Sequence, residues 1–240
     1  MIQVPFFSVR DLVVDYGGVR AIDGVHLEIN KGEIRGLIGP NGAGKSTFID
    51  AVTGRRIPTA GQVQLGGEDI TQLAVVARRM RGVSRSFQRT SIFHDMNVLE
   101  QVFLASHQAQ AKDPERDAVA ILEELDLLQY ADWRAGDLGY GQQRRLDLAL
   151  ALVGSPSVLL LDEPMAGLTV TESRDLAQHL KRLARERNVT VLLVEHDMEV
   201  VFGISDRVTV LELGKPLAEG TPDEIRANPK VREAYLGSAA

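Results

Sequence analysis

The chain has 240 residues, 44% of them hydrophobic, and its 27 basic and 33 acidic side chains give a net charge of −6. This length suits one large domain or a core with a small subdomain, and the acidic balance argues against sequence-independent nucleic-acid binding. The absence of cysteine excludes disulfides and thiolate chemistry. No apolar run reaches the roughly 18 to 20 residues of a membrane span. The first residues show no secretory signal, so we expect a cytoplasmic chain.

In chain order, the first predicted elements are strands. Residues 6–16 and 25–30 alternate between apolar and polar side chains, with a double-glycine turn between them. Residues 33–39, EIRGLIG, have the pattern of a short buried strand, which breaks into a glycine-rich loop before a helix that begins near Lys45. Residues 61–70 add a short strand and a turn.

The later elements alternate between helices and buried strands. Residues 89–152 are helical in character, and an apolar stripe in residues 115–130 predicts a helix there. The predicted buried strands are VLLLD (158–162), TVLLVE (190–195) and RVTVLEL (207–213), with a helix at 172–187 between the first two. Such alternation indicates an α/β sheet with helices on both faces, into which the middle helical stretch is inserted.

A phosphate-binding loop is predicted in GPNGAGKST, which matches G-x-x-x-x-G-K-[ST] between a strand and a helix. Glycine lets the backbone come close enough for successive N–H groups to point at phosphate oxygens, and the helix N-terminus adds positive potential. We expect Lys45 to bind the β- and γ-phosphates and Ser46 to ligate Mg²⁺. The predicted nucleotide contacts of this loop are Gly39, Asn41, Gly42, Ala43, Gly44, Lys45, Ser46 and Thr47.

Two adjacent acids end the buried strand in VLLLDEP. Asp162 is expected to hold Mg²⁺, as the acid at the end of such a strand does in phosphoryl transfer. Neighbouring strand residues point to opposite sides, so Glu163 faces the same site only if the strand ends there, and Pro164 favours that ending. Glu163 is then placed to deprotonate the attacking water. Without a phosphate loop, the simplest interpretation of the two acids would be solvated side chains at a strand end. Beside a phosphate loop, they predict hydrolysis of the γ-phosphate.

The order of the motifs carries a family resemblance. The phosphate loop is followed by a glycine-rich LGYGQ at the start of a helix, then LLLDEP, then VLLVEHD. In this order they resemble the ATP-binding subunits of ABC transporters over essentially the whole chain. The resemblance implies a RecA-like P-loop NTPase core sheet, an N-terminal antiparallel β subdomain and an inserted α-helical subdomain. It implies a single domain, 1–240, with 1–88 and 155–240 as the core with the β subdomain and about 89–154 as the helical subdomain.

The resemblance also assigns roles to single residues. LGYGQ is similar to the family's signature motif, usually Leu-Ser-Gly-Gly-Gln, which contacts the γ-phosphate held by the other subunit of a head-to-tail dimer. A glycine-rich helix start is physically an anion site. Tyr16 matches the aromatic residue that stacks on adenine. The signature residues expected to contact nucleotide are Gly139, Tyr140, Gly141 and Gln142. The implied catalytic residues are Glu163, the switch histidine His196 and the Q-loop glutamine Gln88, and the implied Mg²⁺ ligands are Ser46, Gln88 and Asp162.

Within the family, the chain resembles the ATPases of the branched-chain amino acid uptake group, which includes importers of urea, amides and some aromatic acids. The segments that carry this resemblance are 84–105, 138–152, 162–169, 194–202 and 217–237. It implies ATP and Mg²⁺ as cofactors and a second ABC ATPase subunit, identical or paralogous. It further implies transmembrane permease subunits, indirectly a solute-binding protein, no nucleic acid, and a peripheral position at the cytoplasmic face of the inner membrane. The alternatives are the ATPase of an exporter, such as a lipopolysaccharide-export system, and a non-transport ABC ATPase.

Two positions depart from the family pattern. Gly139 replaces the signature serine and so removes a hydroxyl that would bind the partner-held γ-phosphate, at a cost of about 0.5 to 1.5 kcal/mol for one hydrogen bond. Thr169 stands where the loop after the acids usually has aspartate; its hydroxyl can bond across a dimer but carries no charge. We expect this weakened signature to complete one of two unequal composite sites.

Other classes fit less well. ABC ATPases of DNA repair need a long coiled coil between phosphate loop and signature, whereas about ninety residues without heptads separate them here. Translation-type ABC proteins carry two ATPase copies, and this chain has one phosphate loop. An unrelated P-loop kinase or GTPase would lack the LGYGQQRR helix start.

A run of arginines comprises Arg78, Arg79, Arg81, Arg85 and Arg89. We interpret it as a solvated helix face whose side chains form ion pairs with the acids of the chain. The alternative is a cationic patch that contacts lipid headgroups or a partner.

Overall fold

The computed structural model describes residues 5–86 and 90–236. The N-terminal strands form an antiparallel sheet in the order β2 (Val19–Ile29), β1 (Phe7–Tyr16), β4 (Ala60–Leu65) and β5 (Glu68–Asp69). In β2 the side chains of Val25, Leu27 and Ile29 are buried and those between them are exposed, as expected for a strand with one covered face. The predicted antiparallel β part is confirmed in this sheet.

The second sheet is the core of the molecule. Its six strands lie in the order β10 (Lys215–Gly220), β9 (Arg207–Glu212), β3 (Ile34–Ile38), β8 (Thr190–Val194), β7 (Val158–Asp162) and β6 (Val83–Arg85). The strands from β9 to β6 pair in parallel, and β10 runs antiparallel to β9. Every residue of β3, β7 and β8 is buried, because helices cover both faces. The predicted α/β fold class is confirmed, and the carboxyl ends of three adjacent strands meet at one edge.

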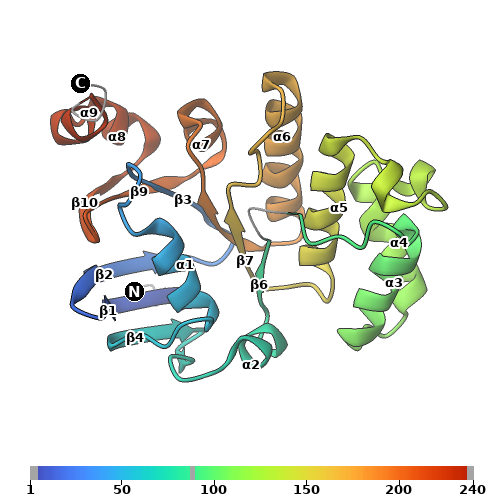
Figure 1. Cartoon of the computed structure of the whole chain (residues 1–240), viewed down its shortest axis with the longest axis horizontal. Coiled ribbons are helices and arrows are strands. Elements are labelled where there is room, and N and C mark those ends of the chain that lie inside the picture. Colours follow the sequence, from blue (N-terminus) through green and yellow to red (C-terminus); the bar gives the residue numbers. More distant parts are fainter. Residues whose placement is uncertain (1–4, 87–89, 237–240) are drawn as a thin grey trace.

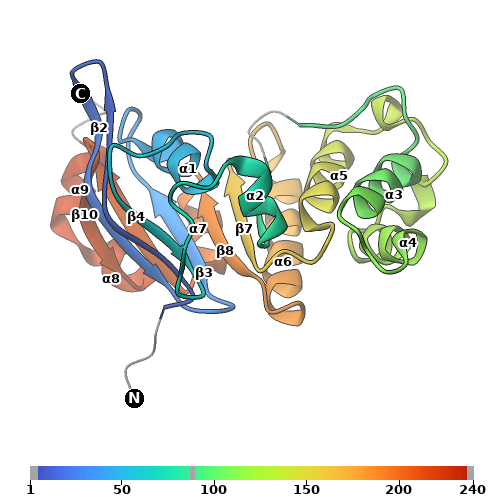
Figure 2. The ribbon, with the colours of Figure 1, turned by 90° about the horizontal axis from the view of Figure 1, so that it is seen from below.

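Helices fill both sides of the core sheet (Figure 1). One side is occupied by α1 (Lys45–Thr53), whose Phe48 and Ile49 share a buried cluster with the antiparallel sheet and with core strands. The other side is covered by α6 (Val170–Glu186) and α7 (Met198–Ile204), which bury Leu176 and Val200 against β7 and β8. The helix α1 therefore lies between the two sheets, as Figure 2 also shows.

The last two helices, α8 (Pro222–Ala227) and α9 (Pro229–Leu236), pack beside β10. At the start of α8, Thr221 caps the helix: its N–H donates to Glu224 Oε2 at 2.8 Å, and its hydroxyl accepts the Glu224 N–H at 3.4 Å. Pro222 occupies the first turn, where a missing N–H costs nothing. None of the helices in residues 5–86 and 90–236 combines the length and apolar character needed to cross a bilayer.

The middle helices form a layer on one side of the molecule (Figures 1 and 2). They are α3 (Val98–Gln108), α4 (Pro114–Glu124) and α5 (Tyr140–Leu152), with the short 3₁₀ turns η1 (Leu128–Tyr130) and η2 (Ala135–Asp137). Their buried side chains belong to the same cluster as those of α6 and of the core strands. The division into a core and a helical subdomain at about residue 89 stays a prediction, since this apolar contact is continuous.

The helix predicted from the stripe in residues 115–130 is shorter than expected. It ends at Glu124, and Asp126 adopts a left-handed backbone conformation with φ of 55°. That conformation cannot continue a right-handed helix, and η1 starts a new turn two residues later.

Among the described residues of the arginine run, Arg78 and Arg85 do not belong to a solvated helix face, and Arg89 lies outside the described residues. Arg78, in α2 (Val75–Met80), is fully buried and binds carbonyl oxygens at the end of α1. Its guanidinium donates to Ala51 O at 2.9 Å, Val52 O at 2.8 Å, Leu73 O at 3.0 Å and Thr71 O at 2.6 Å. A cation at a helix C-terminus satisfies carbonyls that have no partner within the helix. Arg81, by contrast, pairs with Glu68 at the surface, as predicted.

Replacing Arg78 by methionine is expected to lower the free energy of unfolding by about 3 kcal/mol or more, because buried carbonyls lose a charged donor. Urea denaturation followed by circular dichroism measures the change. The control is Arg81→Met, which removes an exposed ion pair and should cost less than about 1 kcal/mol. Equal losses in the two variants would contradict a structural role for the buried guanidinium.

Candidate nucleotide-binding and hydrolysis site

The phosphate loop connects β3 to α1. Gly42 and Gly44 have φ of 80° and 100°, a region that glycine enters without strain. At Gly44 a side chain would also be impossible, because its Cβ would lie 2.7 Å from the carbonyl oxygen of Ala21. The loop thus follows its predicted course from strand to helix, and Ser46 is exposed in the first turn of α1.

Lys45 is the buried cation of this loop. Its side chain is 7% exposed, and Nζ donates to Gly39 O at 2.7 Å and to Pro40 O at 3.1 Å. Burial lowers the pKa of Lys45, while the nearby carboxylates of Glu163 and Asp162 act in the opposite direction. Two neutral carbonyls do not fully replace the water that the buried ammonium group has lost. An anionic ligand would stabilise the ammonium further, so this position favours one.

Asp162 is the last residue of β7 and is 5% exposed. Its Oδ2 accepts from Arg85 Nη2 at 2.8 Å, and Arg85 Nη1 binds Asp50 Oδ1 at 2.6 Å. Burial raises the pKa of Asp162, and Arg85 opposes that rise. The carboxylate of Asp162 and the exposed hydroxyl of Ser46 are hard oxygen donors of the kind that Mg²⁺ prefers, so both fit their predicted role.

Glu163 leaves the strand by a change of backbone conformation. Its φ is 51°, in the left-handed region, and its N–H donates to Val194 O at 2.9 Å. Its Oε1 lies 2.6 Å from Nε2 of His196, which follows β8. β7 ends at Asp162, and the negative charges of both adjacent acids act to raise the pKa of the same lysine, Lys45.

Tyr16 lies at the end of β1 and is 42% exposed. The guanidinium of Arg56 stacks over its ring at 3.7 Å from the centroid and donates to Asp15 O at 2.7 Å. One face of the ring therefore carries a cation, and the stacking of Tyr16 on adenine stays a prediction. Gln88, the predicted Q-loop glutamine, lies outside the described residues, and its role stays a prediction.

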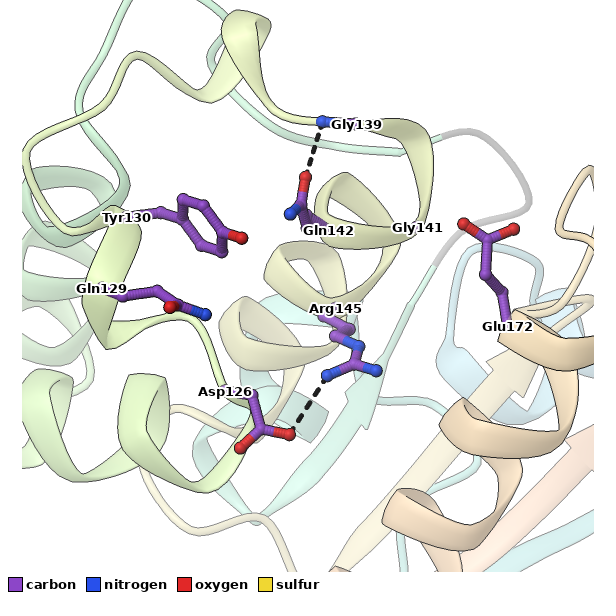
Figure 3. A pocket seen from close by; sticks show the side chains of 8 residues that line it. All are labelled: Asp126, Gln129, Tyr130, Gly139, Gly141, Gln142, Arg145 and Glu172. Carbon is purple, nitrogen blue, oxygen red and sulfur yellow. Dashed lines mark hydrogen bonds and ion pairs between the residues drawn. The ribbon is translucent and has the colours of Figure 1, made fainter.

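The signature residues form a separate surface. Gly139 precedes α5, and its N–H donates to Gln142 Oε1 at 2.7 Å. Figure 3 shows Gln142 turned back toward Gly139 beside a cavity of about 350 Å³. The cavity is lined by Asp126, Gln129, Tyr130, Gly139, Gly141, Gln142, Arg145 and Glu172. In Figures 1 and 2 the start of α5 lies apart from α1, so one chain does not bring signature and phosphate loop together.

The signature helix contacts the loop that follows the acids. Tyr140 Oη donates to Ala166 O at 3.1 Å, and Arg144 Nη2 donates to the same oxygen at 3.2 Å. Thr169 caps α6: its hydroxyl donates to Glu172 Oε2 at 2.7 Å and accepts the Glu172 N–H at 3.3 Å. The Thr169 hydroxyl, which could bond across a dimer, caps a helix of its own chain in this structure.

Sequence reasoning missed two charged residues of this site. The first is Arg85, which stands in the arginine run but has a side chain that is 10% exposed and bridges Asp50 and Asp162. The second is Glu195, which is 5% exposed and directly follows β8. The sequence signal for Glu195 is an acid that directly follows the apolar residues VLLV and precedes a candidate histidine.

Comparison with known proteins shows similarity over the whole length. The family described as ABC transporter matches residues 22–166, and that described as branched-chain amino acid ATP-binding cassette transporter matches residues 215–240. The high-affinity branched-chain amino acid transport ATP-binding protein BraF of Pseudomonas aeruginosa is 42% identical over 252 residues, covering 98% of this chain and 99% of BraF. LivG of Escherichia coli, described in the same words, is 41% identical over 253 residues, covering 98% and 99%.

Solved structures agree with this similarity. An ATP-binding cassette of an ABC transporter in its ADP conformation superposes with a TM-score of 0.88 at 30% identity, covering 97% of this chain and 98% of the other. A nucleotide-free ATP-binding cassette from an ABC transporter gives a TM-score of 0.86 at 30% identity, covering 96% and 98%.

Proposed function

The chain belongs to the family of ABC transporter ATP-binding proteins, and on this premise we propose that it is the ATP-hydrolysing subunit of an importer of branched-chain amino acids. The observation that carries the proposal is the convergence of Lys45, Asp162 and the Glu163–His196 pair at the carboxyl ends of β3, β7 and β8. These strands are neighbours and parallel, and ligands of open α/β sheets bind at that edge.

The residues divide the work of hydrolysis between them. The backbone N–H groups of the phosphate loop and Lys45 bind the phosphates, and the ring of Tyr16 stacks on the base. Ser46 and Asp162 would hold Mg²⁺, which would neutralise part of the negative charge of the phosphates. Glu163 accepts a proton from the attacking water at its carboxylate, and His196, 2.6 Å away, orients that carboxylate. Positioning and charge do most of the work in this reaction.

The solute and the partners follow from the relatives. BraF and LivG are named for branched-chain amino acid transport, and the C-terminal match, residues 215–240, is to the same group. We infer that the chain sits at the cytoplasmic side of the membrane through permease subunits and forms a head-to-tail dimer with a second ATPase subunit. The exporter alternative gains no support from these relatives.

The dimer explains why the signature lies apart from the phosphate loop. Each composite site then takes its phosphate loop from one subunit and its signature from the other. The first N–H groups of α5 have no acceptor within the helix and suit a partner-held phosphate. Gly139 offers that phosphate no hydroxyl, and its own N–H is bound to Gln142.

Restoring the hydroxyl with Gly139→Ser is expected to raise the ATPase rate of the complete transporter, by up to about tenfold for a gain of about 0.5 to 1.5 kcal/mol. Its phosphate-release rate is compared with that of the parent transporter. An unchanged rate would sink the claim that the missing hydroxyl limits this site.

The transport assignment is tested by solute uptake in cells of the source organism that lack this chain. We expect radiolabelled leucine, isoleucine and valine to enter more slowly, and the wild-type gene, but not one that encodes Lys45→Met, to restore uptake. Normal uptake of all three amino acids together with impaired export of an envelope lipid would replace the importer proposal by the exporter alternative.

A further inference from the structure

A buried carboxylate that the hydrolysis scheme does not use binds backbone N–H groups near both catalytic residues. Glu195 is 5% exposed and follows β8 directly. Its Oε1 accepts the N–H of Met165 at 2.7 Å, and its Oε2 accepts the N–H of His196 at 3.1 Å. Met165 lies two residues after Glu163. The carboxylate of Glu195 therefore links the segment that carries Glu163 to His196, whose ring binds the Glu163 side chain.

The segment after β7 is held to the end of β8 at two points. The first is the bond from Glu163 N–H to Val194 O at 2.9 Å, and the second is the bond from Met165 N–H to Glu195 at 2.7 Å. Glu163 has a left-handed backbone, with φ of 51°, a conformation that persists only where neighbouring contacts hold it. Glu195 supplies one of those contacts on the C-terminal side of the turn.

Both oxygens of the side chain are needed for this arrangement. An ionised carboxylate offers two acceptors, whereas glutamine offers one oxygen and an NH₂ donor, which would face an N–H donor. Burial raises the pKa of Glu195, and the N–H groups of Met165 and His196 oppose that rise. Burying an acid lowers the stability of the fold more than burying a neutral or apolar residue would. The contacts of Glu195 therefore indicate a role in positioning rather than in stability.

We propose that Glu195 is a positioning residue that fixes Glu163 and His196 relative to each other for activation of the attacking water. The inference rests on the proposed ATP hydrolysis. The role is separate from nucleotide binding. The hydrogen bonds of Glu195 go to Met165 and His196, which belong neither to the phosphate loop nor to the strand that carries Tyr16.

The test is Glu195→Gln in the complete transporter. We expect kcat to fall by about 10²-fold, the effect of a small misplacement of catalytic groups, while KM for ATP stays within about twofold because nucleotide contacts are intact. In the nucleotide-free chain, hydrogen–deuterium exchange at the amides of Met165 and His196 should be faster. Glu199→Gln is the matched control, because it neutralises an exposed acid paired with Arg174 and should leave kcat and exchange unchanged.

The outcomes separate this inference from the proposed function. If the parent hydrolyses ATP and a folded Glu195→Gln variant keeps its kcat, the positioning role is wrong and the function stands. If the parent hydrolyses no ATP, the proposed function fails, and unchanged amide exchange in the variant would then overturn the positional role as well. Should Glu195→Gln not fold, Glu195→Asp replaces it; a parental kcat in that shorter acid would contradict the inference, and a lowered kcat at parental KM would support it.

Discussion

Glu163→Gln is expected to lower the ATP hydrolysis rate by about 10²- to 10⁴-fold, the range that a general base contributes. Glutamine keeps the size of the side chain but cannot accept the proton of the attacking water. Its amide can still contact His196, so the turn at residue 163 should keep its conformation. Phosphate release measured in the complete transporter gives the rate, and equilibrium dialysis with labelled ATP should show binding as tight as in the parent.

Glu186→Gln is the control for this change. Glu186 is an exposed acid at the end of α6, so neutralising it alters net charge without touching the site. A Glu163→Gln variant that turns over ATP at the parental rate would count against Glu163 as the base. Loss of binding together with turnover would show that the residue serves the nucleotide itself.

Lys45→Met is expected to weaken ATP binding by about 10²-fold, because a charged donor to phosphate oxygens is lost. The increase in unfolding temperature that ATP produces in the parent should therefore disappear in the Lys45→Met variant.

Lys215→Met tests whether any lost positive charge has this effect. Lys215 is an exposed residue of β10 that pairs with Asp23 at 3.1 Å. Its replacement should leave the stabilisation by ATP unchanged. If Lys45→Met keeps that stabilisation too, the buried lysine is not the phosphate ligand.

The sequence predicted those parts of the site that local patterns encode. Apolar strands that end in a glycine-rich loop or in acids located β3 and β7, because burial on both faces leaves the chemistry to the residues that follow. The prediction that Glu163 needs a strand end beside it agrees with β7 ending at Asp162 and with the left-handed φ of 51° at Glu163.

What the sequence could not show were contacts made by long side chains across the fold. Arg78 and Arg85 stand in one run of arginines, yet one binds the end of α1 and the other bridges Asp50 and Asp162. Their partners in α1 and β7 lie between 26 and 77 positions away in the chain, a separation at which no helical or strand periodicity operates. The role of Glu195 could not be predicted for the same reason, because it depends on a hydrogen bond from the distant Met165.

In the proposed dimer, the signature of this chain completes a nucleotide site on a second ATPase subunit. Analytical ultracentrifugation of the Glu163→Gln chain, alone and with the ATPase subunit that copurifies with it, measures this association. We predict that Mg²⁺ and ATP convert the sample to dimers, and that Gly141→Trp at the signature abolishes association while ATP binding to the isolated chain stays unchanged. Dimers that form equally well without ATP, or despite Gly141→Trp, would contradict it.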